Sequence, residues 1–261
     1  MNGSPSIAAS LRRMGAAFLI LAAAPLWPQP APDLQKLLDG VAARLAAAFD
    51  YKLWTADSTT TITEFDRKGV TGKTTRVTKF VRMREGERDE DILKAVETED
   101  GRTTDITAKY AEDSRARREK ERQRRARGRG KGGRRSGAFD LDEIMPFASA
   151  KRAAFDFAVR TATADGGRSL VILEARAKVR DSKMWNGVYT IDPATFDIIK
   201  AEVRPSKNPT FVKELWAEAD IEATGPHLVL SRTRFKIDAG FLIKHVRMIV
   251  EDTYTNIRVG G

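Results

Sequence analysis

The feature that most restricts the fold of this chain is a long series of segments in which apolar and polar residues alternate. In one of them, Phe155, Phe157 and Val159 occupy alternate positions. Asp156 and Arg160 fall on the opposite side. A period of two is typical of a β-strand with one buried face. No helical pattern separates the successive segments of the second half, so the sequence predicts antiparallel strands joined by short turns.

The predicted strands form two series, separated by glycine, proline and Asp-Gly turn signals. They are expected at 59–65, 75–83, 92–97, 154–161, 170–179, 187–192, 198–204, 211–223, 228–237 and 241–254. Each strand of the second series is apolar on one side only. The sheet must therefore curl around something, or it leaves an apolar concavity.

One helix is expected ahead of the strands. Asp33 can cap its first turn, and apolar residues from Leu34 onward recur at a spacing of about 3.6 residues. This pattern predicts an amphipathic helix that ends near Tyr51. A single helix of that length cannot cover so many strands. The predicted fold class is mainly β (α+β), a curved antiparallel meander that forms a half-open barrel around an N-terminal amphipathic helix.

Residues 1–31 match the pattern of a secretory signal peptide, although they do not fix the cleavage site. Arg12 and Arg13 precede the apolar run Met14–Trp27, which is shorter than the roughly 20 residues that a spanning helix needs. We expect an exported protein in the periplasm of a Gram-negative-type envelope. The alternative is an uncleaved N-terminal membrane anchor.

The net charge of +10 comes from one block of the chain. Residues 115–135 contain 12 Lys and Arg against 2 Glu, so the rest has 34 basic and 34 acidic residues. We interpret 112–137 as a basic insertion, either disordered or helical. Its arginines are candidates for contact with an anionic membrane surface. They are Arg117, Arg118, Arg122, Arg124, Arg125, Arg127, Arg129, Arg134 and Arg135.

Nucleic acid is a weaker candidate for this block. Basic residues bind it by counterion release, but aromatic residues for base stacking are absent from 115–135. An exported protein also rarely meets nucleic acid.

Three stretches of the second half resemble a known family: WNGVYTIDPATFDIIKAE (185–202), SKNPTFVK (206–213) and YTNIR (254–258). Together with the order of elements, they are similar to the outer-membrane lipoprotein-sorting (Lol) superfamily, the half-barrels of LolA, LolB and RseB type. The resemblance implies one LolA-like domain over 32–259, interrupted by the basic insertion, which is not part of the family pattern.

The resemblance implies an apolar cavity that shields acyl chains in the periplasm. The inward rows of the strands would line it, and the alternative for each residue is plain core packing. The candidates are Phe155, Phe157, Leu173, Ile199, Leu215, Ile221, Phe235, Val246 and Met248. Trp216 falls in a polar row and is expected to face outward, where it would mark a docking surface or be covered by another segment.

Catalytic chemistry finds little support in the sequence. The chain has no cysteine, and its two histidines, His227 and His245, lie in different predicted strands without metal-ligand spacing. No nucleophile elbow or phosphate-binding loop is present. We therefore expect no enzyme, no cofactor and no metal.

Three functions remain. The first is a carrier or chaperone for lipid or a lipidated protein. The second is a non-catalytic sensor or interaction domain of the same fold that regulates a protein partner. The third is a polyanion-binding protein that acts through the arginine-rich insertion.

Overall fold

The computed structural model of the protein describes residues 33–48, 53–66, 68–84, 87–126, 145–165, 168–241 and 244–260. All of them belong to one compact unit, 31–261. The expected signal peptide or anchor at 1–31 lies outside the described residues. Among the helices of the described part, none is long and apolar enough to cross a membrane.

The described elements are mostly strands. The helices are α1 (Leu34–Ala48), α2 (Thr107–Ala126) and α4 (Ser149–Arg152). The strands are β1 (Leu53–Phe65), β2 (Thr71–Arg84), β3 (Glu87–Glu99), β4 (Arg102–Asp105), β5 (Phe155–Asp165), β6 (Arg168–Ala177), β7 (Trp185–Ile191), β8 (Ile198–Pro205), β9 (Val212–Thr224), β10 (His227–Phe241) and β11 (Lys244–Gly260).

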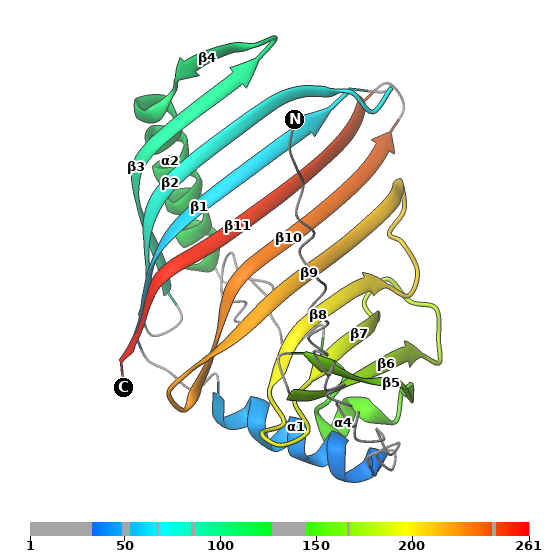
Figure 1. Ribbon diagram of the computed structural model, residues 1–261. Helices are drawn as coiled ribbons and strands as arrows, with labels where there is room; N and C mark the ends of the chain where they lie inside the picture. Colours follow the sequence, from blue (N-terminus) through cyan, green and yellow to red (C-terminus); the bar gives the residue numbers. More distant parts are fainter. Residues whose placement is uncertain are drawn as a thin grey trace, which may run out of the picture. The chain divides into compact units, whose positions relative to one another are not determined.

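The strands form a single sheet of 11 strands in the order β4-β3-β2-β1-β11-β10-β9-β8-β7-β6-β5. Every pairing is antiparallel, and all but one join strands that are consecutive in the chain. The exception pairs β1 with β11 (Figure 1). The edge strands β4 and β5 do not pair with each other, so the sheet stays open. The predicted fold class, a mainly β antiparallel meander with an N-terminal helix, is confirmed.

Helix α1 begins at the predicted position and packs on one face of the sheet. Its first turn is capped by Asp33, whose Oδ1 accepts the backbone N–H of Gln35 at 2.9 Å. Leu37, Leu38 and Val41 on its apolar side are buried. The helix is held mainly by hydrophobic burial.

A glycine lets α1 approach the turn between β7 and β8. A Cβ atom on Gly40 would lie 2.4 Å from Cδ1 of Phe196, so the ring occupies the space of that side chain. Arg44 Nε and Asp197 Oδ1 pair beside it at 2.5 Å. Packing and an ion pair thus hold α1 at the same turn.

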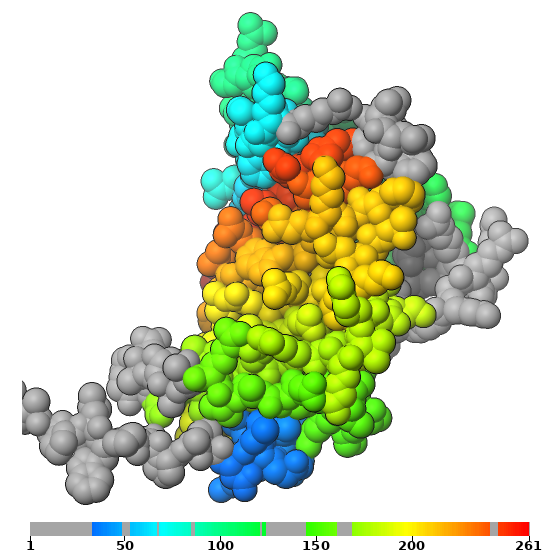
Figure 2. Space-filling model, turned by 90° about the vertical axis from the view of Figure 1, so that its right-hand side faces the viewer, coloured from blue at the N-terminus to red at the C-terminus, as the bar shows by residue number. Residues whose placement is uncertain are grey.

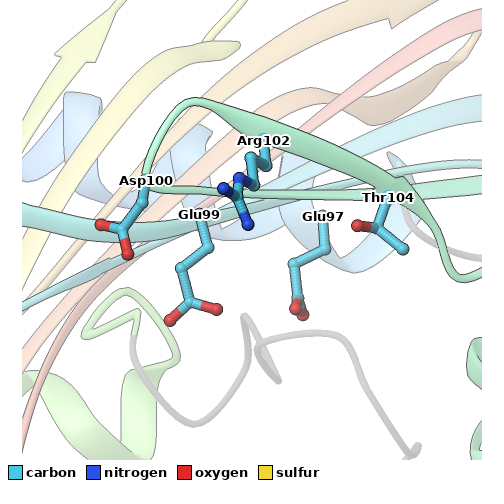
Figure 3. A pocket seen from close by; sticks show the side chains of 5 residues that line it. All are labelled: Glu97, Glu99, Asp100, Arg102 and Thr104. Atoms are coloured by element: carbon cyan, nitrogen blue, oxygen red, sulfur yellow. The ribbon is translucent and has the colours of Figure 1, made fainter.

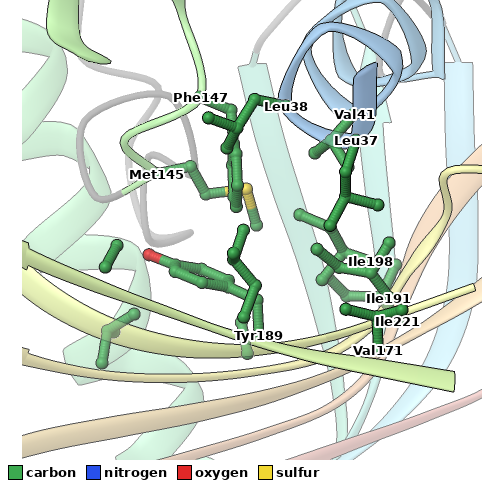
Figure 4. Packing of buried hydrophobic residues seen from close by; sticks show 14 of the residues in the cluster. Leu37, Leu38, Val41, Met145, Phe147, Val171, Tyr189, Ile191, Ile198 and Ile221 are labelled. Atoms are coloured by element: carbon green, nitrogen blue, oxygen red, sulfur yellow. The ribbon is translucent and has the colours of Figure 1, made fainter. Parts of the chain in front are cut away.

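The main core lies between α1 and strands β5–β10 (Figure 4). Phe147 and Tyr189 are fully buried, and their ring centroids lie 4.8 Å apart in an edge-on arrangement. A Cβ on Gly187 would lie 2.3 Å from the Tyr189 hydroxyl, so glycine provides the room for this ring. In the space-filling view, α1 (blue) lies against green and yellow-green strands, away from β2 (cyan) (Figure 2).

A second, smaller apolar cluster lies on β1, β2, β10 and β11. Trp54 and Tyr254 meet edge-on with centroids 5.4 Å apart, and Val81 and Val229 are buried beside them. Helix α2 contacts β3 near this cluster.

The helical alternative for the basic insertion agrees with α2, which begins before the predicted insertion and includes its first part. Residues 127–144 lie outside the described part, so the extent of the insertion and the domain limits stay predictions.

Candidate functional site

Strand pairing brings apolar side chains from four strands onto one face of the sheet. Phe235 of β10 pairs with Ala217 of β9 and with Val250 of β11. Val250 in turn pairs with Ile62 of β1. Directly opposed residues of antiparallel strands point to the same face. These side chains therefore form a continuous row across β9, β10, β11 and β1.

A second row lies beside the first. Ile237 pairs with Leu215 and with Met248, and Val246 follows on the same face of β11. Without the buried Ala217, the two rows are termed the apolar patch, which consists of Ile62, Leu215, Phe235, Ile237, Val246, Met248 and Val250. None of these seven side chains is buried, and Val246 is 44% exposed.

The apolar patch shares its face with the main core. Ala217 and Ile221 on the same side of β9 belong to the core beneath α1, and Phe235 packs against that core. The patch is the continuation of the core surface beyond the area that α1 covers. A contiguous apolar surface that remains incompletely covered is a candidate binding site.

The nine cavity candidates from the sequence separate into two groups. Four of them, Leu215, Phe235, Val246 and Met248, lie in the apolar patch. Three are buried in the core beneath α1, and Phe157 packs partly buried against that core. The three buried ones are Phe155, Leu173 and Ile221.

Ile199 belongs to neither group because β8 contains a bulge. Thr190 of β7 pairs with Lys200, whereas Ile191 pairs with Ile198, so Ile199 has no opposite residue. The bulge turns Ile198 into the core, where it is 0% exposed, and leaves Ile199 half-buried outside it.

Three residues of the apolar patch, Ile62, Ile237 and Val250, were not among the candidates. Ile237 lies between Lys236 and Asp238, and Val250 continues the alternate row of Val246 and Met248, so their local pattern could have identified them. Ile62 joins the patch only because β1 pairs with β11. No local signal in the sequence predicts that pairing.

The apolar patch ends at charged residues of β1–β3. Glu64 pairs with Met248 on one side and with Lys73 on the other, and Lys73 pairs with Glu99. The Lys73 ammonium lies 3.5 Å from Glu64 Oε1 and 3.4 Å from Glu97 Oε2. Glu64 is the main cause of the raised pKa of Lys73. The border of the patch is therefore charged and partly exposed.

A pocket of about 490 Å³ adjoins this border at the β3–β4 hairpin. It is lined by Glu97, Glu99, Asp100, Arg102 and Thr104 (Figure 3). Acidic side chains predominate, yet among the described residues no group of three or more His, Asp and Glu is arranged to hold a metal ion.

A charged network lies where α2 meets the sheet. Glu90 Oε1 accepts from Lys79 Nζ at 3.0 Å and pairs with Arg88 Nη2 at 2.7 Å. Burial alone would raise the pKa of Glu90, but Arg88 and Lys79 together lower it below its ordinary value. Burial raises the pKa of Tyr254, which hydrogen-bonds Arg88. The carboxylate of Glu90 is therefore paired with two basic side chains inside the protein.

The predicted membrane-binding arginines are only partly described. Arg118 Nη1 donates to Asp89 Oδ1 and to the Glu90 carbonyl, both at 2.8 Å, so it connects α2 to β3. Arg117 lies over the Tyr110 ring at 5.8 Å, and Arg122 is exposed. The side chains of Arg124, Arg125, Arg127, Arg129, Arg134 and Arg135 lie outside the described part.

The opposite face of the sheet carries a shallow groove of about 260 Å³ that includes Trp216. Trp216 faces outward, as its polar row predicts, and lines the groove with Val188, Arg204 and Glu174, among others. Both carboxylate oxygens of Glu174 are engaged, by Arg160 at 2.5 Å and by Arg176 at 2.8 Å. The groove is a polar surface with one aromatic wall.

The chain matches no family model and no curated protein. Among solved structures, it is similar to a putative outer membrane lipoprotein-sorting protein domain from Vibrio parahaemolyticus. The two chains are 11% identical, the match covers 87% of this chain and 93% of that chain, and the TM-score is 0.37. A LolA superfamily protein from Nitrosomonas europaea matches with 9% identity, coverage of 88% and 95%, and a TM-score of 0.35. The MucA/MucB complex of Pseudomonas aeruginosa matches with 11% identity, coverage of 86% and 99%, and a TM-score of 0.25. The superfamily that the sequence pattern resembles is thus found among the matching structures.

Proposed function

We propose that this protein is an exported, periplasmic carrier or chaperone that binds the acyl chains of a lipid or of a lipidated protein. The apolar patch carries this proposal, because six half-buried apolar side chains and the exposed Val246 are contiguous on the face that also bears α1. Covering them with an acyl chain removes apolar area from water on both partners. Each buried methylene contributes about 0.8 kcal/mol.

The surroundings of the apolar patch suit such a ligand. The row that contains Met248 continues into Glu64 and Lys73. An acyl chain on the patch would therefore have its polar end near water and charged groups. Binding of this kind needs no catalytic group, and the protein acts without covalent chemistry on its ligand.

Contact with an anionic membrane surface is the second part of the proposal. Arg115, Lys120 and Arg122 are exposed on α2. Basic residues near an anionic bilayer contribute about 1 kcal/mol each. This contact would bring the apolar patch to the lipid that it accepts or releases.

The test is ligand binding by the chain purified without detergent. Native mass spectrometry and solvent extraction identify bound lipid, and titration with 11-(dansylamino)undecanoic acid measures acyl binding. We expect Met248→Glu and Val246→Glu each to weaken probe binding at least about tenfold, because the charge must be desolvated under the chain.

Val179→Glu is the matched control, because Val179 is 63% exposed in the loop between β6 and β7, outside the apolar patch. It should leave probe binding unchanged. A folded protein that binds no probe, or that binds it equally in all three variants, would refute the carrier function.

A regulatory interaction domain is the second candidate, and the groove with Trp216 supports it. Trp216→Ala would then abolish binding of a protein partner and leave the acyl probe unaffected. Polyanion binding by the arginine-rich segment is the third candidate. It predicts that heparin binding is lost when residues 115–135 are replaced by a neutral linker.

A further inference from the structure

Helix α2 meets the sheet with a polar side. Its less exposed positions recur at helical spacing and are Thr107, Tyr110, Ala111, Ser114 and Arg118. Apart from Tyr110, α2 contains no apolar side chain larger than alanine. Burial of large aliphatic side chains, which holds α1 on the sheet, therefore does not hold α2.

The sheet near this contact carries buried polar side chains among small apolar ones such as Val77 and Ala95. Ser58, Thr60, Thr75 and Lys79 are at most 7% exposed. Within the described part of the chain, the buried Ser58 Oγ has no hydrogen-bond partner. The side-chain hydrogen bonds between α2 and β3 come from the Thr107 hydroxyl and the Arg118 guanidinium, and the charged part of this attraction is weakened by salt.

The contacts of α2 fall on the part of β3 that β4 does not reach. Strand β4 pairs only with Val96–Glu99. Before that segment, the Ala95 amide donates to Thr107 Oγ1 at 2.9 Å, and the Glu90 carbonyl accepts from Arg118 at 2.8 Å. Helix α2 therefore occupies positions at which another strand would otherwise pair.

We propose that α2 binds β3 reversibly, and that an anionic lipid surface draws it away from β3. This inference rests on the membrane contact in the proposed function. Exposed Arg115, Lys120 and Arg122 bring the helix to the bilayer. Lipid phosphates then offer Arg118 a bidentate partner in place of Asp89 and the Glu90 carbonyl. Release uncovers the β3 edge before Val96.

Hydrogen exchange of the full chain, followed by mass spectrometry, tests this proposal. The probes are vesicles of phosphatidylglycerol with phosphatidylcholine, and vesicles of phosphatidylcholine alone, both at low salt. Co-sedimentation measures vesicle binding separately. We expect the anionic vesicles to accelerate exchange severalfold in peptides from 87–95, and the neutral vesicles to leave it unchanged.

Two variants separate docking from membrane contact. Asp89→Asn removes one acceptor of Arg118 and keeps every arginine, so exchange of 87–95 should already be faster without vesicles. The double variant Arg115→Gln/Arg122→Gln keeps that acceptor but should reduce vesicle binding and the lipid-induced acceleration together. Strand β8 is the internal reference and should not change.

The outcomes are distinguishable. Vesicle binding with unchanged hydrogen exchange of 87–95 would overturn the release of α2 from β3. It would leave the membrane contact standing. Absence of vesicle binding would overturn both, while acyl-probe binding at the apolar patch is measured independently. If heparin accelerated hydrogen exchange of 87–95 equally, polyanions in general would release α2. This outcome would overturn the lipid surface as the specific partner of the helix. Unchanged exchange in Asp89→Asn would refute the docking role of this ion pair.

Discussion

At the scale of single residues, Glu90 shows how a sheet of this kind holds charge inside. Its carboxylate is shared by Lys79 and Arg88, and the side chains of Glu90 and Lys79 are only 17% and 8% exposed. Removing one partner from a buried ion pair leaves an uncompensated charge, which is more costly than the pair itself is stabilising.

Glu90→Gln should therefore destabilise the protein at neutral pH by about 3 kcal/mol. The folded pKa of Glu90 is lowered from its ordinary value of 4.5, so wild-type stability from this group is complete above that value. As the pH falls through the lowered pKa, the unfolded chain takes up the proton first and this stability is lost. The difference in unfolding free energy between wild type and variant should shrink accordingly.

Urea denaturation between about pH 7 and about pH 3 measures this difference. Glu99→Gln, at an exposed position of the β3–β4 hairpin, is the control and should follow the wild type. A difference that stays constant with pH would contradict the role of the charged network.

At the scale of elements, the bulge in β8 decides which of two adjacent isoleucines reaches the core. Strict alternation with Ala201 and Val203 places Ile199 inward. The shifted pairing between Thr190 and Ile191 places Ile198 there instead. A bulge reverses the facing of every residue on one side of it. The periodic pattern therefore predicts the strand correctly and the side on which Ile199 lies incorrectly.

Alanine substitutions at the two positions should therefore differ. Ile198→Ala removes a fully buried side chain and should cost about 3 kcal/mol, with a cavity left behind. Ile199→Ala should cost less than about 1 kcal/mol, because its half-buried side chain leaves no closed cavity. Chemical denaturation of both variants gives the comparison, and equal losses would show that the bulge is absent.

The two long helices show the same contrast between pattern and context. The apolar stripe of α1 identifies both the helix and the side it buries. The basic composition of α2 permits a helix but does not say where it packs, because polar groups form a contact only where partners such as Asp89 are supplied. Asp89 lies on β3, and its ion pair with Arg118 occupies one of the arginines that could otherwise contact a membrane.

At the scale of the whole molecule, the fold depends on one pairing between the first and the last of the described strands. Strand β11 lies between β10 and β1, so it connects the meander β5–β10 to the meander β1–β4. The apolar patch crosses this junction, since Ile62 of β1 continues the row of Val250. Fold and candidate site therefore form together.

Ending the chain at residue 243 should abolish cooperative folding. Strands β1 and β10 would both become free edges, and the patch would lose the residues of β11. Circular dichroism during heating should show no sharp transition. The peptide 244–260, added in trans, should restore it, and a truncated chain that unfolds cooperatively without the peptide would contradict a central role of β11.

The sequence by itself determined the strand-rich antiparallel fold, the start of α1, and the outward side of Trp216. These follow from local alternation and helical spacing, which act over a few residues. Only the tertiary structure decided the β1–β11 pairing, the β8 bulge, and the division of inward residues between core and apolar patch. The physical reason is that exposure depends on what covers a side chain. Helix α1 covers Leu173 but not Met248, and no local pattern records the position of a helix in space.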